Sequence, residues 1–231
     1  MVVLKCINNA RAYEIHLLEF LHRISTPHNH TIPFTIVLRT DNDTIISMPY
    51  YQPLDNWHPT SVCAAALLGT QLLEAVVFLH AQGVAHRDLK PENVVIDVDL
   101  LRLFIIDYDL ATWVYGRDEV MHGFVGTNGF TAPEVGSSKQ RGRYYSPIAA
   151  DLWATGNILR FMISCIVELD SPELKLLQLI SRLLMDDDAK QRLSAKEALN
   201  MLLGGATSAL PLPVLGNASG LPSVPAILAV H

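Results

Sequence analysis

The 231-residue sequence is poor in cysteine, charge and aromatic residues. Its three cysteines, Cys6, Cys63 and Cys165, lie far apart and form no Cys-x-x-Cys pair. An odd, dispersed set fits neither a disulfide framework nor a zinc site of paired thiolates. The first residues also lack an apolar run followed by a cleavage site of small residues, so we expect no signal peptide. These absences favour an intracellular location, cytoplasmic or nuclear.

The sequence also has no excess of basic residues over acidic ones. The chain has 17 Lys and Arg against 23 Asp and Glu, which gives a formal net charge of −6 at pH 7. Nucleic acids and anionic membranes attract basic surfaces, so we expect neither as a partner. The tryptophans, Trp57, Trp113 and Trp153, have no basic residues interleaved with them. We therefore expect them to pack in the core or in a groove rather than to stack on bases.

Long apolar runs are limited to one segment, residues 61–83, whose length would suit a membrane span. Gln71, Glu74, His80 and Gln82 interrupt it. An acidic side chain inside lipid is costly, whereas a helix that is apolar on most sides also suits a protein core. The segment is therefore predicted to be a buried core helix.

Residues 1–53 predict a strand, a helix and two further strands. The run "VVLKCI" is a short apolar strand pattern, and "ARAYEIHLLEFLHRI" spaces its apolar residues at helical intervals. The runs "IPFTIVLRT" and "TIISMPYY" are rich in β-branched residues, and "DND" between them is a turn signal. We expect this part to be a small, β-rich unit.

Residues 54–203 predict a larger, mainly helical unit. Helices are expected in 61–83, from about residue 148, after Ser171 and after Ser194, where Glu197 stands at the capping-box position. Residues 204–231 carry no charge and are rich in Gly, Ala, Ser, Pro and Leu, so a flexible tail is expected there. The fold class predicted is α+β.

The segment "VAHRDLKPENVVID" sets Asp88, Lys90 and Asn93 close together, and "IIDYDLA" adds Asp107 shortly afterwards. Phosphoryl transfer needs an acid that orients the attacking hydroxyl, a cation near the phosphate oxygens and oxygen ligands for Mg²⁺. Asp88 and Lys90 suit the first two tasks. Asn93 and Asp107 offer one neutral and one charged oxygen to a metal ion.

These motifs resemble the signature of eukaryotic protein kinases. "HRDLKPEN" is similar to their catalytic loop, and "DYD" stands where that family has its metal-binding Asp-Phe-Gly. "GTNGFTAPE" resembles the end of the activation segment, and "DLWATG" the helix that anchors the catalytic loop. The resemblance implies a bilobal fold with ATP and Mg²⁺ between a small β-rich lobe and a larger helical lobe. The resemblance also implies that Arg192 pairs with Glu134 of the Ala-Pro-Glu motif.

The resemblance implies a role for each site residue. The "DLKPEN" sequence resembles serine/threonine kinases, so the implied reaction transfers the γ-phosphate of ATP to Ser or Thr hydroxyls of a protein substrate. The implied catalytic residues are Asp88, Lys90 and the supporting Thr127. The implied residues for ATP and the metal are Lys5 with its partner Glu14, the gatekeeper Met48, Tyr50 of the hinge, and the magnesium ligands Asn93 and Asp107. The oligomeric state is left open.

Two departures from the family pattern leave alternatives open. The sequence has no Gly-x-Gly-x-x-Gly loop before Lys5, so weak ATP binding is expected. Because the catalytic residues are otherwise kept, we expect a truncated kinase rather than a degenerate one. Asp109 replaces the glycine of the Asp-Phe-Gly motif, so altered switching between active and inactive states is expected. One alternative is a pseudokinase that acts as a binding scaffold. Another is a small-molecule phosphotransferase, which shares the His-x-Asp and Asn spacing.

Two secondary hypotheses concern polar residues outside this set. In the family, an arginine such as Arg87 commonly meets a phosphorylated residue, and we expect Asp118 and Glu119 to replace such a phosphate in part. His22, His28 and His30 could suggest zinc, but no cysteine or acid is spaced with them. The histidines are therefore expected to be solvated.

Overall fold

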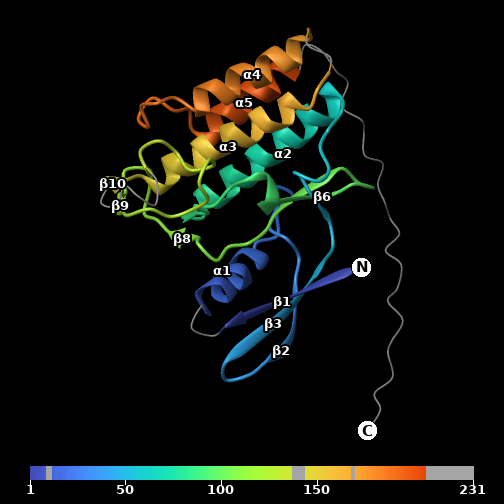
Figure 1. The fold of residues 1–231 in the computed structure, drawn as a ribbon, viewed down its shortest axis with the longest axis vertical. Coiled ribbons are helices and arrows are strands. Elements are labelled where there is room, and N and C mark those ends of the chain that lie inside the picture. Colours follow the sequence, from blue (N-terminus) through green and yellow to red (C-terminus); the bar gives the residue numbers. More distant parts are fainter. Residues whose placement is uncertain (9–11, 137–143, 168–169, 207–231) are drawn as a thin grey trace.

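The computed structural model describes residues 1–8, 12–136, 144–167 and 170–206, which form a small part and a larger helical part (Figure 1). The small part contains β1 (Val2–Asn8), α1 (Ala12–His22), β2 (Thr35–Arg39) and β3 (Asp43–Pro49). Its order confirms the predicted strand, helix, strand and strand. Most of the expected tail, from residue 207 onward, lies outside the described residues.

The three strands of the small part form an antiparallel sheet in the order β1-β3-β2. The predicted turn between β2 and β3 is present and is closed by Thr40. The backbone N–H of Thr40 donates to the carbonyl of Asp43 over 2.8 Å, and the Thr40 hydroxyl accepts from the Asp43 N–H over 3.0 Å. The central strand β3 therefore pairs with a partner on each side, whereas β1 and β2 form the edges of this sheet.

The large part is built on four helices, with short strands between and around them (Figure 1). The helices are α2 (Val62–Ala81), α3 (Pro147–Ser164), α4 (Pro172–Leu184) and α5 (Ala195–Ala206), and a 3₁₀ turn spans Pro91–Asn93. The strands form the sheet β4-β6-β7 (Gln52–Pro53, Val94–Asp97, Arg102–Ile105) and the pairs β5-β8 (Val84–Ala85, Thr112–Trp113) and β9-β10 (Met121–His122, Tyr144–Tyr145). The α+β class is confirmed.

Serine side chains begin the helices of the large part. The hydroxyls of Ser61, Ser146 and Ser171 each accept a backbone N–H of the first helical turn. Ser194 and Glu197 form the predicted capping box, because the Ser194 N–H donates to Glu197 and the Glu197 N–H donates back to the Ser194 hydroxyl. Each bond satisfies an amide that has no partner within its own helix.

Helix α2 is the central helix of the core. It is the one helix in the described ranges that is long and apolar enough to cross a membrane, yet 61% of its most apolar window is buried inside the protein. It packs against α3, α4 and α5, as the prediction of a core helix requires. Helices α3 and α4 approach closely at Gly156, where an added Cβ would lie 2.7 Å from Cγ of Met185.

His30 corrects the prediction that the histidines are solvated. Its side chain is buried, with Nδ1 2.9 Å from the Leu103 carbonyl and Nε2 3.3 Å from the Glu74 carboxylate. His28 also reaches Glu74, at 3.3 Å, while His22 is exposed. Sequence spacing missed this contact because Glu74 lies on α2, far from His30 in the chain.

Candidate active site

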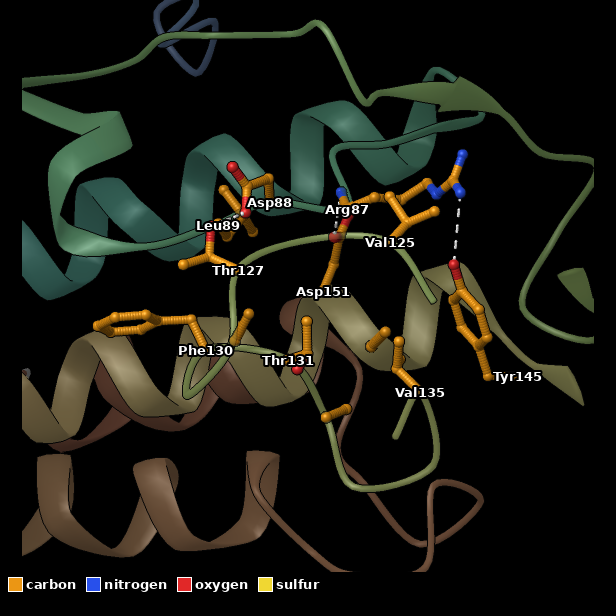
Figure 2. Close-up of a pocket in the computed structure, with 13 residues that line it drawn as sticks. Arg87, Asp88, Leu89, Val125, Thr127, Phe130, Thr131, Val135, Tyr145 and Asp151 are labelled. Carbon is orange, nitrogen blue, oxygen red and sulfur yellow. Dashed lines mark hydrogen bonds between the residues drawn. The ribbon is translucent and has the colours of Figure 1, made fainter. Parts of the chain in front are cut away.

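The segment that carries Asp88 is held by a buried carboxylate of α3. Strand β5 leads into residues 86–90, where Asp151 accepts the backbone N–H groups of His86 and Arg87 over 2.7 and 2.8 Å. Arg87 has a positive φ of 67°, a conformation that costs energy for a non-glycine residue. The two bonds to Asp151 stabilise this bend beneath the loop (Figure 2).

Asp88 lies at the centre of a compact hydrogen-bond network. Its Oδ1 accepts the Thr127 hydroxyl over 2.8 Å, and its Oδ2 lies 2.9 Å from the Lys90 ammonium group. Lys90 also donates to the Thr127 hydroxyl over 2.8 Å. The Asn93 amide nitrogen donates to Asp88 Oδ2 and to the Asp88 carbonyl, so the amide oxygen is the Asn93 atom that can face a cation. The structure brings all four residues together.

Thr127 reaches Asp88 because the preceding residue is glycine. Gly126 has a φ of +105°, and an added Cβ would lie 2.8 Å from the Arg87 carbonyl oxygen. The cavity around Asp88, Thr127 and Phe130 measures only about 10 Å³, which is room for one water molecule (Figure 2). The catalytic loop and the 125–135 segment are therefore closely packed against each other.

A second network joins the small part to the large part. The Lys5 ammonium group lies 2.6 Å from Glu14 Oε1 and 2.8 Å from Asp107 Oδ1. Burial lowers the pKa of Lys5, but the hydrogen bonds to Asp107 and Glu14 outweigh it and raise that pKa overall. Burial likewise raises the pKa of Asp107, but the bond from Lys5 prevails and lowers it, and the nearby charge of Lys90 adds to the effect.

Glu14 is more deeply buried than its two partners and behaves differently. Its side chain is 3% exposed, against 30% for Lys5 and 43% for Asp107. Burial raises the pKa of the Glu14 carboxyl despite the bond from Lys5, and the charges of Asp107 and Asp109 raise it further. Lys5 therefore lies between one carboxyl whose pKa is lowered, that of Asp107, and one whose pKa is raised, that of Glu14.

The residue after Asp107 is anchored in the core of the protein. Asp107 has a positive φ of 65°, which Asp tolerates better than most residues. The following side chain, Tyr108, is buried with its ring centroid 4.9 Å from that of His86. Its hydroxyl is 3.3 Å from the Thr31 hydroxyl, and burial raises its pKa. Sequence reasoning missed Thr31, because no motif links it to residue 108.

Arg192 and Glu134 form a buried two-point ion pair. The two terminal nitrogens of Arg192 lie 2.5 and 2.8 Å from the two Glu134 oxygens. Arg192 also donates to the carbonyls of Ala149 and Asp186. The pair fastens the end of the 125–135 segment to the start of α3 and to the loop before α5.

Met48 and Tyr50 lie where β3 leaves the small sheet. Met48 is partly buried against the core, whereas the Tyr50 side chain is 42% exposed. The neighbouring Tyr51 stacks on Phe104, with ring centroids 5.1 Å apart. The structure thus places this segment at the connection between the two parts. Among the described residues, no hydrogen bond or ion pair joins the Met48 or Tyr50 side chain to the networks around Asp88 and Lys5.

The hypothesis that Asp118 and Glu119 face Arg87 is wrong for this structure. Arg87 donates to the Tyr145 hydroxyl over 3.4 Å, and its Nε is buried without a partner among the described residues (Figure 2). Glu119 instead accepts the backbone N–H of Tyr115. The acids follow a turn that directs them back onto their own segment.

The oxygen donors suit a magnesium ion held partly by a nucleotide. Across the described residues, no three Asp, Glu, His or Cys side chains gather where they could hold a metal by themselves. Magnesium usually takes one or two protein ligands together with phosphate and water oxygens. The Asp107 carboxylate and the Asn93 amide oxygen match that requirement.

Comparisons with known proteins agree with the motifs. Residues 1–173 match the family model of the protein kinase domain. The serine/threonine-protein kinase cds1 of Schizosaccharomyces pombe is 34% identical over 180 residues, which is 73% of this chain and 37% of that protein. The testis-specific serine/threonine-protein kinase 5 of Mus musculus is 39% identical over 94 residues, 41% of this chain and 24% of that protein.

A plant relative shows a higher identity over a shorter stretch. The putative CBL-interacting protein kinase 13 of Oryza sativa subsp. japonica is 46% identical over 91 residues, 38% of this chain and 17% of that protein. The chain therefore spans well under half the length of these curated relatives.

Proposed function

The chain belongs to the protein kinase family, in its serine/threonine group, and on that premise we propose that it transfers the γ-phosphoryl group of ATP to Ser or Thr hydroxyls of a protein. The observation that carries the proposal is the Asp88 network, in which one carboxylate is held by Thr127, Lys90 and Asn93. We assign residues 1–53 to the small lobe and 54–203 to the large lobe.

In this proposal Asp88 orients the substrate hydroxyl. The hydroxyl donates a hydrogen bond to the Asp88 carboxylate, which directs an oxygen lone pair toward the phosphorus atom. The bonds from Thr127 and Lys90 keep the carboxylate in one rotamer, so less ordering is required when the substrate binds. The Lys90 ammonium group also balances negative charge on the phosphoryl group during transfer.

ATP binds between the two networks. Lys5, held by Glu14, is the cation for the α and β phosphates, while Met48 and Tyr50 contact the adenine. Asp107 and Asn93 are the magnesium ligands. When bound, Mg²⁺ would neutralise negative charge on the phosphate oxygens. The lowered pKa of Asp107 supports this assignment, because an ionised carboxylate binds the cation.

A protein is the substrate class that the large part favours. The Arg192–Glu134 pair fastens the 125–135 segment into a rigid ledge beside Asp88, which suits an extended peptide better than a small molecule. The net charge of −6 argues against nucleic acid or an anionic membrane as a partner. The dispersed cysteines favour an intracellular environment, and we propose a cytoplasmic or nuclear location.

Phosphate transfer from labelled ATP to a library of Ser- and Thr-containing peptides tests the proposal. We expect Mg²⁺-dependent transfer by the unmodified chain and a loss of at least about 100-fold in Asp88→Asn, because orienting and proton-accepting groups contribute factors of that size. Asp99→Asn is the matched control, since this exposed aspartate follows β6 and belongs to neither network. Equal rates for Asp88→Asn and the unmodified chain would contradict the mechanism.

An ATP titration with and without Mg²⁺, run beside the transfer assay, separates the scaffold alternative. A pure scaffold should show neither metal-dependent ATP binding nor phosphate transfer. Transfer to small alcohols or aminoglycosides alone, with none to peptides, would favour the small-molecule phosphotransferase.

A further inference from the structure

A group of three aromatic residues joins α1 to the large part. Tyr13 and Phe20 lie about two turns apart on one face of α1, and Trp113 lies in β8, which runs beside that helix (Figure 1). The Tyr13 hydroxyl accepts the backbone N–H of Trp113 over 2.8 Å. The Phe20 and Trp113 rings meet edge to face, with centroids 4.8 Å apart and planes at 76°. We name Tyr13, Phe20 and Trp113 the aromatic clamp.

The Trp113 N–H is available because of the pairing between β8 and β5. The two strands are antiparallel, and the neighbouring Val114 N–H donates to the Gly83 carbonyl over 2.8 Å. Successive N–H groups of a strand point to opposite sides, so the Trp113 N–H points away from β5. Tyr13 supplies its acceptor. Because β5 leads directly into the catalytic loop, the clamp connects α1 to the segment that carries Asp88.

Packing in the core alone does not explain the positions of these three side chains. Tyr13, Phe20 and Trp113 remain 40%, 38% and 41% exposed, respectively. The residues of α1 that enter the core are Ile15, Leu17, Leu18 and Leu21, and Leu17 lies between Tyr13 and Phe20 on their side of the helix. The clamp therefore extends the attachment of α1 from the core onto the neighbouring exposed surface of the helix.

The position of α1 determines whether Glu14 reaches Lys5. Glu14 directly follows Tyr13 in α1, and its Oε1 lies 2.6 Å from the Lys5 ammonium group. Lys5 lies on the strand β1, whereas Glu14 lies on the helix α1. A shift of α1 by a few ångströms would break this ion pair and leave Lys5 bound to Asp107 alone, with its charge directed away from a nucleotide.

We infer that the aromatic clamp consists of positioning residues that hold α1 where Glu14 orients Lys5 for the phosphates of ATP. The inference rests on the proposed function insofar as Lys5 binds ATP. The clamp acts through Glu14 and Lys5 and touches neither the nucleotide nor the substrate.

ATP affinity measured with two clamp variants tests the inference. One edge-to-face aromatic contact or one hydrogen bond corresponds to a factor of roughly two to twelve in an equilibrium constant. Tyr13→Phe removes only the acceptor oxygen, and we expect it to weaken Mg²⁺-ATP binding about threefold. Trp113→Ala removes the ring contact, and we expect about a tenfold loss. The KM for the peptide should stay within a factor of about two, because the clamp does not touch the Asp88 network.

Tyr115→Ala is the matched control. Tyr115 is an aromatic residue of the same segment, but its side chain is fully exposed, so the variant should bind ATP like the unmodified chain. Trp113→Phe keeps an aromatic edge toward Phe20, and we expect it to restore most of the affinity lost in Trp113→Ala. A merely structural effect would weaken ATP and peptide binding together and would not be rescued.

Hydrogen exchange of the α1 backbone provides a readout that needs no activity. Faster exchange of residues 13–21 in Tyr13→Phe and Trp113→Ala, with no change in Tyr115→Ala, supports the clamp. Unchanged α1 exchange and unchanged ATP affinity in folded Tyr13→Phe overturn it. If the unmodified chain binds no ATP, the proposed function fails instead, while the exchange rates still decide whether the clamp holds α1.

Discussion

The small and large parts of the molecule are stabilised in different ways. Half of the residues of α2 and most of those of α3 are buried, and both helices pack against two or more others. In the small sheet, one residue of β1 and none of β2 is buried. Several apolar side chains of these two strands are largely exposed, including Val2, Leu4, Val37 and Leu38. The main core therefore lies among the helices of the large part and extends into the small part mainly through α1 and β3, whereas most of β1 and all of β2 lie outside it.

Polar and aromatic attachments join the small part to the large part besides shared core contacts. Lys5 of β1 pairs with Asp107, and the His30 hydrogen bonds connect the α1–β2 segment to α2 and β7. The Thr31 hydroxyl contacts the Tyr108 hydroxyl, and the aromatic clamp joins α1 to β8. Because Asp107 and Tyr108 belong to the candidate site, the arrangement of the small part and the geometry of the site are coupled.

The largest expected effect concerns the buried ion pair of the large part. Glu134→Ala leaves the fully buried Arg192 guanidinium without its carboxylate. An unpaired buried charge is expected to lower the free energy of unfolding by about 3–5 kcal/mol. Chemical denaturation measures the loss. Asp170→Ala, which removes an exposed partner of Lys175, is the control and should leave stability almost unchanged.

A pair of leucine truncations tests the comparison directly. Leu72 of α2 is fully buried, and Leu72→Ala should cost about 2–5 kcal/mol because it leaves a cavity. Leu4 of β1 is 63% exposed, and Leu4→Ala should cost less than about 0.5 kcal/mol. Urea midpoints of the two variants give both numbers. Similar losses would mean that the small sheet is as tightly packed as the helical core.

Removing the side chain that begins α4 should have a smaller effect on stability, and it sharpens the contrast between the two parts. The Ser171 hydroxyl accepts the Leu174 N–H over 3.1 Å at the start of α4, so Ser171→Ala should cost about 1 kcal/mol. In the small part, Arg39 pairs with Glu19 at 3.0 Å on the surface, and Arg39→Ala should cost less than about 0.5 kcal/mol. Thermal unfolding of the two variants measures both losses of stability. A greater loss for Arg39→Ala would contradict our account of the small part.

The smallest expected effect is a change in the pH dependence of stability when Glu74 is replaced. The hydrogen bond from His30 outweighs burial and lowers the pKa of Glu74 below its ordinary value of 4.5. A lowered folded-state pKa stabilises the protein above pH 4.5, and that contribution disappears as pH falls through the folded value. The stability gap between the unmodified chain and Glu74→Gln should therefore narrow between about pH 5 and pH 3. A gap that stays constant in urea titrations would exclude this linkage.

Local patterns predicted much of the fold. The strand, helix and hairpin order of residues 1–53 and the serine-led helix starts are short-range features, and the structure confirms them. The α2 prediction also held, because one acidic residue among many apolar ones distinguished a core helix from a membrane span. The His30 prediction was wrong, since a polar side chain in a loop segment becomes buried only when a distant carboxylate and carbonyl meet it.

For the candidate site, too, short-range motifs were predictable and contacts between distant elements were not. The motif around Asp88, Lys90 and Asn93 is contiguous, and its resemblance to kinases also pointed to Thr127, Asp107 and the Lys5–Glu14 pair. The structure brings these groups within hydrogen-bond distance, while their catalytic roles stay proposals. The Tyr108–Thr31 contact and the aromatic clamp had no motif, because each joins residues of different elements at no fixed spacing.

The sequence by itself determined the family, the α+β class and the chemical identity of the site, since residue types at short, fixed spacings specify turns, helix starts and a catalytic loop. The tertiary structure alone decided which carboxylates flank Lys5, where Arg87 points and how α1 is held. Those outcomes depend on contacts between elements far apart in the chain. Their free energies arise only when both elements are already in place.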